Sequence, residues 1–235
     1  MGRGLFVTGT GTGVGKTYVA ALVASAVRAS GRRAGVYKPV ASDCQSCDGR
    51  LVSADAVALW EAAGRPGTVE QVCPQSFAAP LAPHLAARAE GRRVDANLLR
   101  SGIEFWRETS EFVLVEGAGG LMSPLSDDDY NADLAAEFGY PLVVVSANVL
   151  GTINATLQTL ITANTYCEGL DVAGIVFNSP QPRHNDPSTD SNRDELARRC
   201  VAPVLATLEF GSTFDRVVDW WKLAGSKEQG AGSGK

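Results

Sequence analysis

The sequence has few of the residues that build disulfide frameworks or metal clusters: its 235 residues include five cysteines and two histidines. An odd number of cysteines in a chain of this length is typical of a reduced protein, so we expect a cytoplasmic location. Cys44 and Cys47 have C-x-x-C spacing, but a structural zinc site needs four ligands and no second pair accompanies them. We interpret both as ordinary loop thiols, with a zinc site as the alternative.

Long apolar runs and an excess of positive charge are also absent. No apolar run is long enough to span a membrane, and the chain begins directly with a strand pattern, so we expect neither a membrane span nor a signal peptide. With 21 basic and 26 acidic residues the net charge is −5, which argues against nonspecific binding of nucleic acid. The hydrophobic content of 45% is, in contrast, ample for a core.

The most informative stretch is LFVTGTGTGVGKT, residues 5–17. An apolar run is followed by alternating glycines and then by Lys16 and Thr17, which open a helical pattern. A phosphate-binding loop needs this order, because backbone N–H groups at the helix start point toward the anion. Lys16 would reach the β- and γ-phosphates, and the Thr17 hydroxyl would bind Mg²⁺. Thr10 occupies the usual place of the first glycine and Gly9 lies one residue earlier, so a glycine-rich turn with a chance G-K-T is the alternative.

Strand patterns alternate with helical patterns over the rest of the chain. This alternation predicts one α/β domain with a mostly parallel central sheet of about seven strands, covered by helices on both faces. We place this domain at residues 1–224 and interpret residues 225–235 as a flexible tail. The expected strands are 5–7, 34–37, 112–115, 142–147, 172–178 and 204–208; the expected helices are 17–30, 55–63, 94–107, 131–138, 152–168 and 190–200; irregular connections are expected at 40–52 and 64–83.

Polar residues at the carboxyl ends of strands are the candidates for chemistry, because ligands of such sheets bind there. Lys38 follows the second expected strand, and a solvated surface lysine is the alternative. Glu116 follows FVLV as a candidate Mg²⁺ ligand, and the next residues, GAGG, imply close approach of a ligand. Asn178 ends the strand VAGIVFN. Asp55 opens a helix, where a helix-capping acid is the alternative.

Several motifs of the chain, in their order and spacing, resemble those of the dethiobiotin synthetase family. They are VTGTGTGVGKT, YKPVAS, SADAVAL, FAAPLAPH, LVEGAGGLMSPL, LGTIN and the strand end at Asn178, and they extend to about residue 208. The longer phosphate loop is a feature of that family. The resemblance implies a P-loop NTPase domain and an ATP-dependent cyclo-ligase of biotin biosynthesis. One amine of 7,8-diaminopelargonate takes up CO₂, the carbamate attacks the γ-phosphate of ATP, and the second amine closes the ring and expels phosphate.

The resemblance also implies roles for individual residues in a homodimer with the substrate at its interface. The implied catalytic residues are Thr12, Lys16, Lys38 and Ser42. The implied nucleotide-binding residues are Gly13, Val14, Gly15, Lys16, Thr17, Tyr18, Glu116, Gly119 and Asn178, with Asn178 at the adenine edge. The implied Mg²⁺ ligands are Thr17, Asp55 and Glu116. The implied substrate-binding residues are Thr12, Lys38, Ser42, Gly151, Thr152 and Asn154, the last three from the partner subunit, where a helix start suits the substrate carboxylate.

Two stretches depart from the family pattern. Gly13 stands where some members carry an acid, so we expect no carboxylate contact to the amines from that position. Residues 208–221, LEFGSTFDRVVDWW, replace a glycine-and-proline turn near adenine, which leaves the base selectivity open.

Three other functions are alternatives to the ligase that the resemblance implies. A cobyrinate-type amide ligase carries a glutaminase domain, for which 235 residues leave no room. A partitioning or septum-site ATPase usually has a lysine early in the phosphate loop, where this chain has GTGTG, and needs a basic patch or an amphipathic tail. A degenerate structural homologue would not need the polar residues that are retained here: Lys16, Thr17, Lys38, Asp55 and Glu116.

Overall fold

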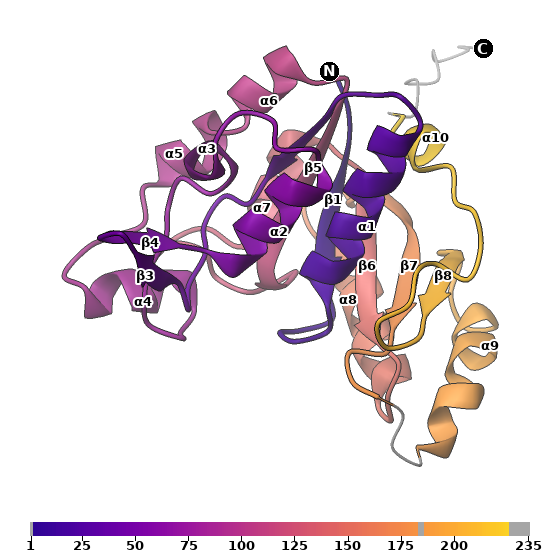
Figure 1. The fold of residues 1–235 in the computed structure, drawn as a ribbon. Helices are drawn as coiled ribbons and strands as arrows, with labels where there is room; N and C mark the ends of the chain where they lie inside the picture. Colours follow the sequence, from indigo (N-terminus) through magenta and orange to yellow (C-terminus); the bar gives the residue numbers. More distant parts are fainter. Residues whose placement is uncertain (1, 183–185, 226–235) are drawn as a thin grey trace, which may run out of the picture.

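A parallel sheet of six strands crosses the centre of the molecule, in the order β2-β5-β1-β6-β7-β8 (Figure 1). The computed structural model describes residues 2–182 and 186–225. Its sheet strands are β1 (Arg3–Gly9), β2 (Ala34–Tyr37), β5 (Phe112–Gly120), β6 (Leu142–Ala147), β7 (Val172–Asn178) and β8 (Val204–Leu208). All neighbouring pairs are parallel, which confirms the predicted fold class. The main sheet has six strands, whereas the sequence predicted about seven, because the described chain after β8 forms no further strand.

The central strands are apolar along almost their whole length. In β1 every residue after Arg3 is buried, and β6 is buried up to its last residue. Continuous burial of this kind arises when helices cover both faces of a parallel sheet, so that no side chain can face water. Figure 1 shows α1 (Lys16–Ala29) and α2 (Ala54–Ala62) on one face, with α7 (Asn131–Phe138) and α8 (Thr152–Thr165) on the other.

Helix α1 shows how the sequence pattern produces the packing. Its buried apolar residues recur at helical spacing, so one stripe of the helix faces the sheet. These residues are Val19, Ala20, Val23, Ala24 and Val27. The helix ends at Ala29, one residue before the predicted stop, and Gly31 takes a left-handed backbone with φ 82° directly afterwards.

The predicted loop at 40–52 contains a hairpin. Strands β3 (Gln45–Cys47) and β4 (Arg50–Val52) pair antiparallel and form a small separate sheet. The two residues between them have positive φ, 49° at Asp48 and 77° at Gly49, and an Asp-Gly pair favours such a turn. The sequence therefore contained a hairpin signal that the loop prediction missed.

The single helix predicted at 94–107 is wrong, because two helices occupy this stretch. They are α5 (Ala96–Ser101) and α6 (Glu104–Thr109). The break lies against Tyr37 of β2, whose hydroxyl donates to the carbonyl oxygens of Leu98 at 2.9 Å and Leu99 at 3.0 Å. A Cβ at Gly102 would lie 2.5 Å from the same hydroxyl, so a tertiary contact decides where the first helix ends.

Other helices also differ from the prediction in their bounds. Short helices that were not predicted are α3 (Val69–Val72), α4 (Pro83–Ala89) and α10 (Trp220–Leu223). The helix predicted at 190–200 is a 3-10 turn, η1 (Pro187–Asp190), followed by α9 (Asn192–Ala197), and α8 ends at Thr165 rather than at residue 168. Although α10 is far from β1 in sequence, it packs beside the start of that strand, where the Gly4 N–H donates to the Ala224 carbonyl oxygen at 3.4 Å.

Two predictions concern the ends of the molecule and its relation to membranes. The flexible tail predicted at 225–235 lies outside the described residues except for Gly225, and the domain boundary at residue 224 stays a prediction. No helix within residues 2–182 and 186–225 has the length and apolar character to cross a bilayer.

Trp106 is among the largest fully buried side chains, and its indole N–H donates to the Gln71 carbonyl at 3.2 Å. We expect Trp106→Ala to lower the free energy of unfolding by about 3 to 5 kcal/mol, because the cavity left behind cannot fully collapse. Val217→Ala is the control, since Val217 is fully exposed, and should change it by less than about 0.5 kcal/mol. Urea denaturation measures both, and equal effects would contradict the burial of Trp106.

Candidate active site

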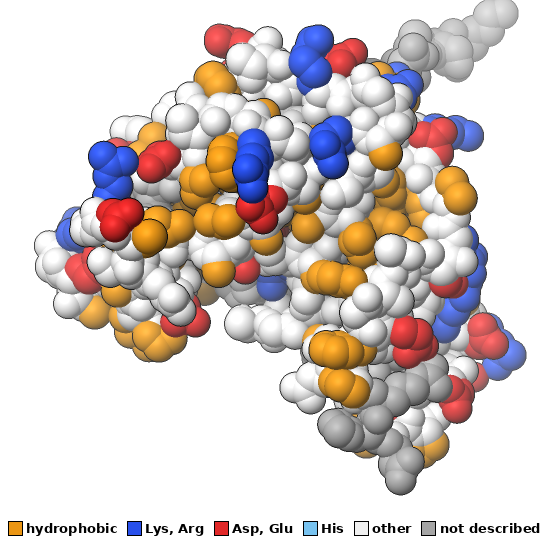
Figure 2. All heavy atoms as spheres, in the orientation of Figure 1, with side chains coloured by type: hydrophobic (Ala, Val, Ile, Leu, Met, Phe, Trp, Pro, Cys, Tyr) orange, Lys and Arg blue, Asp and Glu red, His pale blue; other side chains and the backbone are white. Residues whose placement is uncertain are grey.

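The site lies at the carboxyl ends of the central strands, along the lower edge of the sheet in Figure 1. Strand β1 lies between β5 and β6. The strands that follow β1 in the chain, β2 and β5, lie on one side of it in the sheet, and the later strands β6, β7 and β8 lie on the other side. Ligands of open α/β sheets bind where the strand order reverses in this way. A cavity of about 1070 Å³ opens at this edge. Figure 2 shows the surface hollowed there, between the part that carries β3, β4 and α4 and the part that carries β8 and α9.

The loop between β1 and α1 has the backbone that a phosphate-binding loop needs. Gly13 has φ 77° and Gly15 has φ 88°, both in the left-handed region that favours glycine. Gly15 is the N-cap residue of α1, and no side chain caps that helix among the described residues. The first N–H groups of α1 therefore remain for an anion, and the helix dipole favours negative charge at the same place.

Lys16 is buried at the start of α1, and its ammonium donates to the Gly11 carbonyl oxygen at 2.9 Å. Burial lowers the pKa of Lys16, against an opposing effect from the carboxylate of Glu116. The ammonium thus contacts the loop that would hold phosphate, and because it is shielded from water it would attract an anion strongly.

Lys38 lies between two carboxylates. Its Nζ is 2.8 Å from Glu116 Oε1 and 2.7 Å from Asp55 Oδ2, and the side chains of Lys38 and Glu116 are only 4% and 1% exposed. Burial alone would lower the pKa of Lys38, but the charges and hydrogen bonds of Glu116 and Asp55 outweigh it and raise the pKa above its usual value. The alternative of a solvated surface lysine is therefore wrong.

Asp55 is held by the same cluster and does not cap its helix. Ser53 is the N-cap residue of α2, and its hydroxyl accepts from the Ala56 N–H at 3.3 Å. Burial acts to raise the pKa of Asp55, but Lys38 outweighs it, and the pKa lies below its usual value. Asp55 is therefore an ionised carboxylate beside Lys38, and the helix-capping alternative is wrong.

The predicted Mg²⁺ ligands meet in this cluster. Thr17 Oγ1 donates to Glu116 Oε1 at 2.8 Å, and the same hydroxyl contributes to the lowered pKa of Asp55. The other oxygen of this carboxylate, Glu116 Oε2, is buried and has no hydrogen-bond partner among the described residues. A hydroxyl and two carboxylates suit Mg²⁺, which is commonly bound by one or two carboxylates together with waters and substrate phosphates. The residues present therefore fit this ion.

The cavity brings together most of the predicted site residues. It is lined by Thr12, Gly13, Gly15, Lys16, Thr17, Tyr18, Lys38, Ser42, Asp55, Glu116, Gly119 and Asn178. Val14, Gly151, Thr152 and Asn154 are not part of this lining. Residues that the sequence prediction did not assign also line it, among them Ser53, Ser123 and Phe210. Ser123 lies within the motif LVEGAGGLMSPL, so the motif located it but gave it no role.

Asn178 lies against the phosphate loop. Its Nδ2 donates to the Val14 carbonyl oxygen at 2.9 Å, and a Cβ at Gly15 would collide with the same amide. Asn178 therefore holds the loop from the end of β7. Its predicted contact with the adenine edge stays a prediction.

The turn before α8 was predicted to bind the substrate carboxylate. Gly151, with φ 92°, is the N-cap residue of α8, and both Gly151 and Asn154 are exposed. Thr152 is different: its side chain is buried and lies 2.6 Å from the Ser146 hydroxyl, while its N–H donates to the Val149 carbonyl at 3.1 Å. A ligand at this turn would therefore meet Gly151 and Asn154, and the substrate role of the turn stays a prediction.

The C-x-x-C pair does not form one unit. Cys44 is buried and Cys47 is exposed in β3. The part of the chain that the structure describes holds no group of three or more His, Cys, Asp or Glu side chains placed to bind a metal ion. The assignment as ordinary thiols stays a prediction.

The buried pair of Lys38 and Glu116 predicts a large loss of stability when one partner is removed. We expect Lys38→Met to lower the free energy of unfolding by about 3 to 5 kcal/mol, because it leaves the Glu116 carboxylate buried without its cation. Lys222→Met is the control, since Lys222 is exposed. Chemical denaturation of both variants at neutral pH measures the difference, and an equal loss in both would contradict the buried pair.

Comparison with known proteins agrees with this geometry. A family model described as an AAA domain matches residues 3–217. A ParA family ATPase from Chlorobium tepidum has a TM-score of 0.53 at 13% identity, covering 90% of this chain and 84% of that one. The septum site-determining protein MinD from Pyrococcus horikoshii has a TM-score of 0.52 at 16% identity, covering 89% and 82%. At these identities the likeness shows the fold alone.

Curated relatives are more similar in sequence. The ATP-dependent dethiobiotin synthetase BioD of Rhodopirellula baltica is 42% identical over 214 residues, covering 86% of this chain and 82% of the relative. The protein of the same name from Anaeromyxobacter dehalogenans is 44% identical over 206 residues, covering 88% and 89%. BioD 1 of Escherichia coli O157:H7 is 36% identical over 209 residues, covering 87% and 89%. The resemblance predicted from the motifs is confirmed, and the chain belongs to the ATP-dependent dethiobiotin synthetase family.

Proposed function

We propose that this chain is an ATP-dependent dethiobiotin synthetase, which converts 7,8-diaminopelargonate, CO₂ and ATP into dethiobiotin, ADP and phosphate. The observation that carries the proposal is the buried ion pair of Lys38 and Glu116, which the half-exposed carboxylate of Asp55 joins beside the phosphate loop. Phosphoryl transfer to a carbamate brings several negative groups together, so the enzyme must position them and neutralise their charge. Two lysines, Lys16 and Lys38, are buried in one cavity where they can do so.

Seven residues of the cavity have a role in this proposal. Lys16 binds the β- and γ-phosphates, and the N–H groups at the start of α1 hold the phosphate oxygens. Lys38, whose Nζ contacts the same Glu116 oxygen as the Thr17 hydroxyl, binds the carbamate and the transferring phosphoryl group. Thr12 and Ser42 donate to or accept from the diamine and its carbamate. Thr17, Asp55 and Glu116 would hold Mg²⁺, which would supply positive charge against the phosphates of ATP.

The order of events follows from the chemistry of the two amines. One amine of the substrate attacks CO₂ and loses a proton, which gives a carbamate. A carbamate oxygen attacks the γ-phosphorus of ATP and ADP leaves, so that a carbamic-phosphoric anhydride forms. The second amine attacks the carbamate carbon, loses a proton and expels phosphate, which closes the ureido ring. The protein supplies position and charge in each step and forms no covalent bond with the substrate.

The proposed enzyme is a cytoplasmic homodimer in which the substrate's carboxylate tail reaches the partner subunit. The exposed turn at Gly151 supports this part of the proposal, because it offers a helix start outside the cavity that the nucleotide would fill. Leu150 is 81% exposed and Val149 is 44% exposed at the same turn. Exposed apolar side chains beside a helix start are consistent with a surface that a second copy covers.

Turnover of ATP with and without the diamine tests the reaction. A ligase should hydrolyse ATP only when 7,8-diaminopelargonate and CO₂ are present and should form dethiobiotin in equal amount, which mass spectrometry can quantify. ATP hydrolysis that is independent of the diamine would instead indicate a nucleotide-driven switch.

Lys16→Ala and Glu116→Ala should each lower kcat by roughly 10²-fold or more, because each removes a charge that acts on the transferring phosphoryl group. Circular dichroism should show an intact fold in the Lys16→Ala variant, whose side chain lies at the end of the sheet. Steady-state kinetics of purified variants decides the point, and normal turnover in either would refute the proposed roles.

Subunit exchange tests the shared site. A Lys16→Ala chain is mixed with an Asn154→Trp chain, in which a bulky side chain covers the exposed helix start. A two-fold dimer with shared sites should regain about a quarter of wild-type activity, since half of the dimers are hybrids and each hybrid has one intact site. Failure to regain activity after proven exchange, or full activity in a monomer, would contradict the shared site.

A further inference from the structure

A buried asparagine holds the backbone that directly follows Glu116. Asn131, the first residue of α7, is fully buried at 0% exposure. Its Nδ2 donates to the carbonyl oxygens of Ala118 at 2.7 Å and Gly120 at 2.8 Å, and its Oδ1 accepts from the Ala118 N–H at 3.1 Å. Because both ends of one amide are bonded to the same short stretch, the stretch cannot move without breaking several buried hydrogen bonds.

This stretch forms a wall of the active site. Gly119 lines the cavity with a left-handed φ of 77°, and the Gly120 N–H donates to the hydroxyl of Ser123, which lines it too. Gly120 also pairs with Gly9 at the start of the phosphate loop, where a Cβ on Gly120 would lie 3.3 Å from the Gly9 carbonyl oxygen. Any shift of the stretch would therefore reach both the cavity wall and the phosphate loop.

The amide of Asn131 also limits where Glu116 can lie. A Cβ at Gly117 would collide with Asn131 Oδ1, so the asparagine packs directly on the residue next to Glu116. We propose that Asn131 is a positioning residue, which fixes the backbone of residues 117–120 and thereby the Glu116 carboxylate and the Gly119 wall for the metal–nucleotide complex. This inference rests on the proposed function for the identity of the reaction, but its effect on nucleotide binding can be measured separately.

The expected effect of replacing Asn131 follows from the hydrogen bonds that its side chain makes. Asn131→Asp keeps the shape of the side chain but replaces its donor with an oxygen that faces the carbonyl oxygens of Ala118 and Gly120. Two acceptors cannot bond to each other, so the stretch must move away. Residues that orient metal ligands from behind typically change metal affinity or activity by about 10- to 100-fold when they are replaced.

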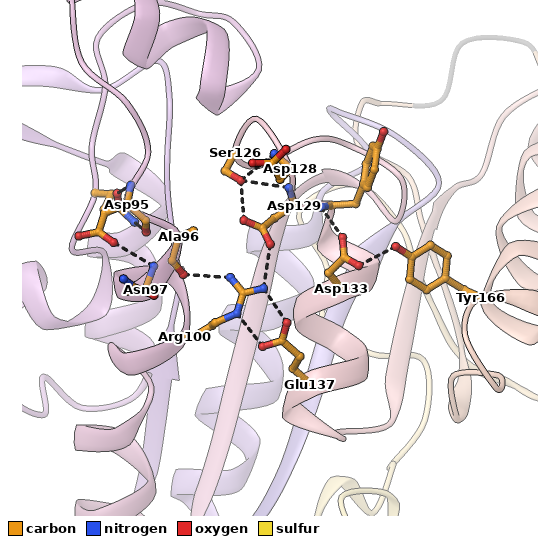
Figure 3. Close-up of polar contacts among 12 residues, drawn as sticks. Asp95, Ala96, Asn97, Arg100, Ser126, Asp128, Asp129, Asp133, Glu137 and Tyr166 are labelled. Carbon is orange, nitrogen blue, oxygen red and sulfur yellow. Dashed lines mark hydrogen bonds and ion pairs between the residues drawn. The ribbon is translucent and has the colours of Figure 1, made fainter.

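A cluster that joins α5 to α7 and to the loop before α7 supplies the matched control (Figure 3). Arg100 of α5 makes two hydrogen bonds with the Glu137 carboxylate on α7, at 2.7 and 2.6 Å, and one with Asp129 Oδ1 at 2.8 Å. Asp129 in turn accepts from the Ser126 hydroxyl. This cluster fastens α7 and the loop before it, as Asn131 does, but none of its residues lines the cavity. Arg100→Met should therefore destabilise the same region without changing the site.

The experiment compares Asn131→Asp with Arg100→Met in the full chain. Calorimetry measures binding of a non-hydrolysable ATP analogue at several Mg²⁺ concentrations, steady-state kinetics gives kcat and KM, and thermal unfolding gives Tm. Asn131→Asp should weaken Mg²⁺-dependent binding of the analogue by about 10-fold or more and lower kcat by a similar factor. Arg100→Met should lower Tm to a comparable extent while its binding constant and kcat stay within about two-fold of wild type.

The result that would overturn the proposal is an Asn131→Asp variant that loses Tm as Arg100→Met does but keeps its binding constant and kcat. If Asn131→Asp does not fold, Gly117→Ala provides the same comparison, because its new methyl group would push against Asn131 Oδ1. Wild-type binding and kcat in the Gly117→Ala variant would also overturn the proposal. Absence of turnover in the wild-type chain would refute the proposed function and leave the binding comparison valid.

Discussion

The buried contact of Lys38 with Glu116 and Asp55 is the interaction on which the rest of the site depends. A lysine that is 4% exposed needs opposite charge close by, and the two carboxylates that provide it come from separate parts of the chain, the middle of β5 and the start of α2. The cluster therefore requires β2, β5 and α2 to be in place together. It also leaves Glu116 Oε2 without a hydrogen-bond partner among the described residues, at the place where Mg²⁺ is proposed to bind.

The second constraint on the site is that two backbone segments must approach each other closely. The phosphate loop and the stretch after Glu116 contact each other through glycines, so that Gly9 and Gly120 pair directly. Two amide side chains hold these segments: Asn178 bonds to the Val14 carbonyl, and Asn131 bonds to residues 118 and 120. Side-chain amides suit this task, because each offers both a donor and an acceptor to peptide groups that are shielded from water.

Much of the fold could be predicted because it depends on local patterns. The apolar runs gave every strand of the main sheet, and the bounds of β2, β6, β7 and β8 agree with the prediction. Errors lie where distant contacts decide the outcome. The helix expected at 94–107 ends early because the Tyr37 hydroxyl packs against Gly102, which no local pattern can reveal. The hairpin of β3 and β4 had a local signal in Asp48-Gly49, which the polar composition of the segment obscured.

The sequence by itself determined the phosphate loop, the family and the residue types of the site, because these depend on spacing along the chain and on the chemistry of each side chain. It could not decide whether Lys38 was solvated or Asp55 a helix cap, since both alternatives fit their neighbours in sequence. Only the tertiary structure decided this, by bringing the end of β2 beside the middle of β5 and giving the cap of α2 to Ser53. Asn131 shows the same limit: its role depends on a backbone stretch that folding places against it.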